Sequence, residues 1–195
     1  MAQQLHLPQQ IAATQLSLGN AYTNKDISKA LDFYQQVIHS TGSATTQIQA
    51  QLNRLNLLTD IQRKLNTLPA SPEITALIDA IPNLLLEITA QIDRLPPGRP
   101  AIYARINFAH HLMAWNRLTL INPNSSPNPN PSPGKIIPQL LATAIQQAKT
   151  LQDTRAESFA QGNLGEWYEQ QQQWAAAQQE AMTALQLAQQ SMPPI

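Results

Sequence analysis

Apolar residues recur every three or four positions through almost the whole sequence, and this helical period constrains the fold more than any other feature. The dominant residues, Leu, Ala and Gln, all favour helices. Residues that favour strands are scarce, because Val occurs only at position 37 and 5% of the residues are aromatic. We therefore expect an all-α fold, with the 195 residues forming a single domain.

Prolines, glycines and capping residues divide this pattern into eight predicted helices. Asp26 is expected to cap the second helix, Ser71 the fourth, and a capping box from Thr154 to Glu157 the seventh. Pro82 lies inside the fourth helix and is expected to kink it, because proline removes a backbone hydrogen bond there. The predicted helices cover roughly residues 8–22, 27–38, 44–67, 72–95, 100–120, 136–151, 154–169 and 174–192.

Two segments without a helical period lie between these helices. The stretch NPNSSPNPNPSPG, residues 122–134, has five prolines alternating with Asn and Ser, and we expect a mobile surface loop there. The four glutamines at 170–173 are predicted to form the polar turn between the last two helices. Because most turns are short, consecutive helices are expected to be antiparallel neighbours in a bundle or a solenoid.

The last two helices carry a pattern that decides between these two architectures. From Ala160 the sequence reads AQGNLGEWYEQQQQWAAAQQEAMTALQLAQ, which resembles a tetratricopeptide repeat. Gly165 and Ala177 are small where the helices of such a hairpin cross, and Leu164 and Tyr168 fill the seam beside them. The resemblance implies antiparallel hairpins stacked as a right-handed solenoid.

The first helix repeats this pattern more loosely. Leu18, Gly19 and Tyr22 match it, but the segment from Tyr22 to Ala30 is one residue shorter than its counterpart in the last hairpin. The turn between the first two helices is therefore expected to differ. Ile11, Leu18, Gly19 and Tyr22 are predicted to share the inward face of the first helix.

Much of the chain also resembles the cyanobacterial proteins in which such repeats precede a caspase-like CHAT peptidase domain. The resemblance is carried by LSLGNAY ending at Tyr22, IQAQLNRLNLL from Ile48, LPPGRPAIYARINFA from Leu95 and DTRAESFAQGNLGEWYE from Asp153. It implies that this segment is the repeat arm of a larger protein with the CHAT domain downstream. That domain uses a His and a Cys, and the present chain has no Cys, so no catalytic residue is carried over.

The resemblance further implies a function and the residues that perform it. Tetratricopeptide solenoids bind peptides or proteins on a concave face built from the first helix of each hairpin. The matching positions are mostly uncharged and partly apolar, which favours a peptide or a helix as the ligand. They are Asn20, Thr23, Tyr103, Ile106, His110, Met113, Phe159, Glu166 and Glu169.

Composition and motifs argue against several other functions. Twelve basic and twelve acidic residues balance without a basic run, which disfavours nucleic-acid binding. His110 and His111 point about 100° apart on a helix and do not converge on one metal. With no catalytic or phosphate-binding motif, we expect no enzyme activity, metal or cofactor. No signal peptide or membrane-spanning run is found, so a cytoplasmic protein is expected.

Two alternatives stay open at this point. The segment is either a partner-binding scaffold or a structural spacer or oligomerisation module without an external ligand. Trp174 falls on a core position of the repeat, whereas Trp167 lies off the seam and is a candidate for partner contact. The sequence does not indicate the partner or the oligomeric state.

Overall fold

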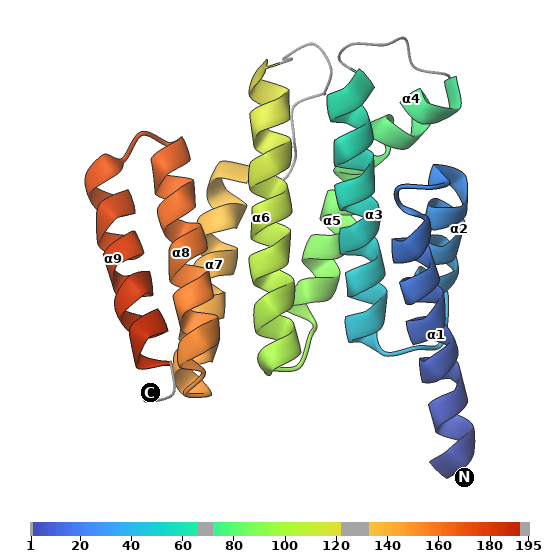
Figure 1. Ribbon diagram of the computed structural model, residues 1–195, viewed down its shortest axis with the longest axis horizontal. Helices are drawn as coiled ribbons and strands as arrows, with labels where there is room; N and C mark the ends of the chain where they lie inside the picture. Colours follow the sequence, from blue (N-terminus) through green and yellow to red (C-terminus); the bar gives the residue numbers. More distant parts are fainter. Residues whose placement is uncertain (1, 66–71, 122–132, 192–195) are drawn as a thin grey trace. The chain divides into compact units, whose positions relative to one another are not determined.

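The computed structural model describes residues 2–65, 72–121 and 133–191, and over these residues the chain forms nine helices and no strand (Figure 1). The all-α prediction is therefore confirmed, and the helices pack mostly as sequential antiparallel neighbours. The chain divides into two compact units, Met1–Leu95 and Pro96–Ile195. That both belong to a single repeat domain stays a prediction.

The first unit is organised around its longest buried helix, α3, which contacts the other four helices of the unit. Asp26 caps the second helix as predicted, because its carboxylate accepts a hydrogen bond from Lys29 N at 3.1 Å. The buried side chains are mainly the leucines and isoleucines of α3 and α5. The helices are α1 (Ala2–Tyr22), α2 (Ile27–Ile38), α3 (Ala44–Leu65), α4 (Pro72–Asp79) and α5 (Ile81–Asp93).

The predicted fourth helix is two helices, which accounts for nine helices where eight were expected. Pro82 lies in the first turn of α5, where the missing N–H removes no intrahelical hydrogen bond. Proline thus starts a new helix after Ala80 instead of kinking a continuous one. The predicted inward face of α1 is also wrong in part, since Ile11 and Leu18 are exposed.

The second unit is built from α6 (Arg99–Ile121), α7 (Pro133–Thr150), α8 (Thr154–Gln170) and α9 (Trp174–Gln190). The cap of α8 is Asp153 and not Thr154, because the Asp153 carboxylate accepts from Ala156 N at 3.1 Å. The same carboxylate pairs with Arg99 Nε at 2.6 Å. Small side chains let three helices approach closely in the core, which contains Ile102, Ile106, Ala144, Ala148, Ala156 and Ala160.

The α8–α9 hairpin has the close crossing that the repeat pattern predicts. A Cβ atom placed on Gly165 would lie 3.2 Å from Ala177 O, so even alanine would require a small shift of α9. The core position predicted for Trp174 is wrong, because its side chain is 63% exposed, and Trp167, a candidate for partner contact, is only 4% exposed. Among the described helices of its unit, α9 packs against α8 alone, and none of them covers the side of α9 that carries Trp174.

The turns of the second unit agree with the sequence where they are described. Gln171–Gln173 connects α8 to α9, as predicted from the glutamine tract. Most of the predicted Pro/Asn-rich loop, residues 122–132, lies outside the described residues, and Pro133 and Gly134 belong to α7. Over the described ranges, no helix combines the length and apolar character needed to cross a membrane.

Candidate partner-binding surfaces

Aromatic side chains join the first helices of the two hairpins in the second unit. Tyr103 of α6 and Phe159 of α8 meet edge to face, with ring centroids 6.3 Å apart. Phe159 is 49% exposed, and the Arg155 guanidinium lies 5.8 Å from the centroid of its ring. A half-exposed aromatic pair offers apolar area whose burial by a partner would be favourable.

Charged side chains connect the same two helices farther along. Glu166 of α8 accepts a hydrogen bond from Arg117 Nη2 at 2.7 Å, and its other oxygen lies 3.9 Å from His110 Nδ1. All three side chains are substantially exposed. Exposed ion pairs contribute only about 0–1 kcal/mol, so a partner could replace these contacts at little cost. We call Tyr103, His110, Arg117, Phe159 and Glu166 the α6–α8 surface.

Three of the predicted groove residues do not belong to this surface. Ile106 and Met113 are buried, because they lie on the core side of α6. Glu169 is exposed and lines a hollow of about 380 Å³ between α8 and α9. This hollow adjoins the α6–α8 surface, because Glu166 lines it as well. The predicted residues of the second unit are thus distributed over the core, the α6–α8 surface and this hollow.

The two predicted residues of the first unit lie together in a polar hollow of about 340 Å³. Asn20 Oδ1 accepts hydrogen bonds from Tyr34 Oη at 2.9 Å and from Asn53 Nδ2 at 2.7 Å. Thr23 Oγ1 lies 3.1 Å from the same Tyr34 hydroxyl. We call this site the asparagine hollow; it is lined by Asn20, Thr23, Asn24, Tyr34, Asn53 and Asn56.

Sequence reasoning missed four of these six residues. It considered only positions of the first helix, whereas Asn53 and Asn56 come from α3 and Tyr34 comes from α2. A signal was present, since Asn20 and Asn24 are four residues apart and Asn53 and Asn56 three apart. The second spacing places Asn53 and Asn56 on one face of α3, whereas Asn24 lies in the turn that follows α1. That the two pairs converge depends on how α1 and α3 pack.

The two adjacent histidines differ strongly in environment. His110 is exposed near Glu166, whereas burial, aided by the positive charge of His110, lowers the pKa of His111 to about 4. His111 is therefore neutral at pH 7. The rings lie edge to face with centroids 6.0 Å apart. Among the described residues no group of three or more His, Asp and Glu side chains could hold a metal ion.

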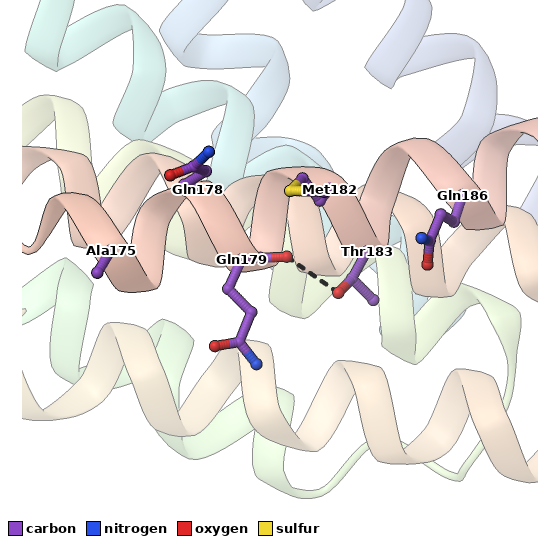
Figure 2. A pocket seen from close by; sticks show the side chains of 6 residues that line it. All are labelled: Ala175, Gln178, Gln179, Met182, Thr183 and Gln186. Carbon is purple, nitrogen blue, oxygen red and sulfur yellow. Dashed lines mark hydrogen bonds between the residues drawn. The ribbon is translucent and has the colours of Figure 1, made fainter.

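The outer face of α9 is largely uncharged and partly apolar. Figure 2 shows Met182 among glutamines along this helix, with Thr183 Oγ1 donating to the Gln179 carbonyl oxygen at 3.0 Å. Trp174, Met182 and Leu185 are exposed large apolar residues of this helix. At about 100° per residue they fall within about 80° of the helix circumference. We call these three residues the α9 apolar face.

Comparison with known proteins adds no family to this description. No protein-family model matches the chain, and no curated protein matches it.

Proposed function

We propose that this chain is a tetratricopeptide-like module that binds a peptide or protein partner. The partner would bind on the exposed surface of α6 and α8, which are the first helices of the two hairpins in the second unit. The observation that carries the proposal is the α6–α8 surface. A half-exposed aromatic pair lies at one point of it, and Glu166 with Arg117 and His110 lies at another. Aromatic and arginine side chains are the residues that most often dominate binding energy at protein interfaces.

The architecture that we propose is a right-handed solenoid of helical hairpins. Its support is the close crossing of α8 and α9 at Gly165, together with the contact of α6 with α8 across one intervening helix. The further proposal, that the module is the arm of a CHAT-type protein, is supported only by the sequence segments quoted above. The coding sequence beyond Ile195 tests it, because a CHAT domain should be encoded there.

Site-specific photo-crosslinking tests the binding proposal. A photoreactive phenylalanine analogue at Phe159 should capture the same partner from cell extract as the analogue at His110. The analogue at Thr143, an exposed residue of α7, serves as the control and should capture little. Replacing Tyr103, His110 and Glu166 together by Ala should abolish capture by the analogue at Phe159. Unchanged capture by the folded triple variant would rule out the α6–α8 surface.

The α9 apolar face favours a second candidate function, oligomerisation without an external ligand. Exposed apolar patches often mark protein interfaces. Light scattering after size-exclusion chromatography should then show a concentration-dependent increase in mass, which Met182→Lys with Leu185→Lys should remove. A monomer at every concentration would exclude this candidate.

A further inference from the structure

We propose that the asparagine hollow of the first unit binds the main chain of an extended peptide, independently of its side chains. The inference rests on the proposed function, since it names the part of a peptide partner that this unit takes. It goes beyond the predicted groove because most of the lining residues come from positions that the repeat pattern does not assign.

The hollow is held in place by its own hydrogen bonds. Tyr34 is buried, and its hydroxyl donates to Asn20 Oδ1. Asn53 Nδ2 donates to the same oxygen, while Asn53 Oδ1 accepts from Gln49 Nε2 at 2.8 Å. Because Asn20 Oδ1 is bonded to donors of α2 and α3, the carboxamide plane of Asn20 is fixed.

This network leaves a set of donors and acceptors for a ligand. Asn20 Nδ2 donates to no described residue, and the exposed carboxamides of Asn24 and Asn56 likewise have no described hydrogen-bond partner. Each carboxamide combines a carbonyl oxygen with N–H donors in one plane. A peptide group offers the same combination, so the two can pair reciprocally.

The lining disfavours other ligands of this size. It contains no charged side chain, so a phosphate or a carboxylate would lose its hydration without gaining a cation. It contains no exposed aromatic face on which a sugar ring could stack, since the only ring is that of buried Tyr34. An extended peptide presents one donor and one acceptor per residue, at a spacing of about 3.3 Å. This neutral, regularly spaced ligand fits the hollow.

Side-chain amide NMR on the full chain provides the test, with the capped peptide Ac-(Ala-Ser)4-NH2 as the probe. The NH2 signals of Asn20, Asn24 and Asn56 should shift saturably at peptide concentrations up to about 10 mM. The same peptide with alternate residues N-methylated keeps its side chains but loses half of its N–H donors. We expect it to bind about three- to tenfold more weakly, the effect of losing about one net hydrogen bond.

Matched protein variants complete the test. Asn56→Asp removes an NH2 group at a position without internal hydrogen bonds, and should weaken binding about three- to tenfold. Asn83→Asp makes the same change on an exposed residue of α5 and should bind like the wild type. No saturable shift, equal binding of the N-methylated peptide, or equal binding by Asn56→Asp would each overturn the inference. Shifts caused by maltotriose in place of the peptide would overturn it as well.

The outcome is separable from that of the proposed function. If the analogue at Phe159 captures a partner but the peptide leaves the asparagine signals unchanged, only this inference fails. If neither experiment gives a signal, the binding function itself fails. Capture that is reduced by Asn56→Asp and not by Asn83→Asp would support both.

Discussion

The first and last hairpins of the described chain contain the same short motif in different surroundings. Leu18-Gly19 with Tyr22 opens the contact of α1 with α2, and Leu164-Gly165 with Tyr168 opens that of α8 with α9. A Cβ on Gly19 would lie 2.6 Å from Tyr34 Cε1, whereas on Gly165 it would meet Ala177 O at 3.2 Å. A ring fills the first crossing, and the backbone of the next helix fills the second.

The leucines that precede the two glycines differ in their exposure to solvent. Leu18 is 39% exposed, and Leu164 is 8% exposed. One physical reason lies in the turn, because the segment between Tyr22 and Ala30 is one residue shorter than its counterpart. One residue corresponds to a rotation of about 100° of the following helix. An identical motif therefore fixes where two helices approach, but not which side chains meet there.

The largest contrast should come from shortening the two leucines. Leu164→Ala removes a buried side chain and should lower the free energy of unfolding by about 2–5 kcal/mol. Leu18→Ala should lower it by less than about 1 kcal/mol, because the side chain already contacts water. Urea unfolding followed by circular dichroism measures both. Equal losses would mean that the two leucines are equally buried, contrary to the structure.

The glycines provide the second contrast. Alanine is favoured over glycine inside a helix by about 1 kcal/mol. At Gly165 this gain should nearly offset the cost of a small shift of α9 away from the new methyl group. The free energy of unfolding of Gly165→Ala should therefore lie within about 1 kcal/mol of that of the wild type. At Gly19 the new methyl group would overlap the buried ring of Tyr34, whose hydroxyl is fixed by Asn20. Gly19→Ala should therefore destabilise the protein by about 1–3 kcal/mol.

Thermal unfolding of the two alanine variants measures this difference. A stabilising Gly19→Ala would contradict the close contact of Gly19 with Tyr34. Because Tyr34 also donates a hydrogen bond to Asn20, Gly19→Ala should shift the side-chain amide NMR signals of the asparagines in the hollow. Gly165→Ala, in the other unit, should leave these signals unchanged.

The sequence predicted the all-α class and most helix limits correctly, because helix-forming residues and turn residues are local signals. It failed where burial depends on a neighbouring helix. Trp174 is exposed although the pattern predicts a core position, since the pattern assumes a further helix over α9 and no described helix of the second unit covers that side. Pro82 is predicted from the sequence to kink one helix, because the apolar residues keep their helical period across Ala80. The period therefore does not mark the point where α5 begins.

The candidate surfaces were predicted less well than the fold. Helical position placed Tyr103 and Phe159 on α6 and α8, but their meeting depends on the packing of these helices, and the burial of Met113 depends on which side of α6 faces the core. The asparagine hollow needs α1, α2 and α3 together. Sites assembled from several helices cannot be found from the pattern of one helix.

A partly buried histidine, His111, distinguishes the second unit from the first, where His39 is exposed. The pKa of His111 is lowered to about 4 from 6.5, so between these values the unfolded state binds more protons than the folded state. The free energy of unfolding should therefore fall as the pH falls through this window, by about 2 kcal/mol at pH 5. Unfolding measured at pH 7 and pH 5 checks this.

One variant separates the effect of His111 on the pH dependence of stability from the effect of the carboxylates. His111→Gln should abolish the loss between pH 7 and pH 5. The pKa of Asp153 is lowered, first by its hydrogen bond with Arg99, so Asp153 affects stability only below its ordinary value of 3.8. If His111→Gln keeps the full pH dependence, His111 is not the buried group responsible.

The smallest contrast lies in the turns. Gln152 and Gln172 lie in the turns that follow α7 and α8 and have positive φ angles of 54° and 60°. No other described residue has a positive φ. Glycine adopts this conformation without the strain of a Cβ atom, although its unfolded chain is more flexible. Gln172→Gly should therefore raise the free energy of unfolding by about 0.5–1 kcal/mol.

The turn of the first hairpin provides the matched control. Lys25 has no positive φ, so Lys25→Gly brings the entropic cost of glycine without relieving strain, and should lower stability slightly. Opposite signs in thermal unfolding are the expected result. If both variants destabilise the protein, the left-handed turn at Gln172 is not strained, and the difference between the two hairpins lies in their helix crossings alone.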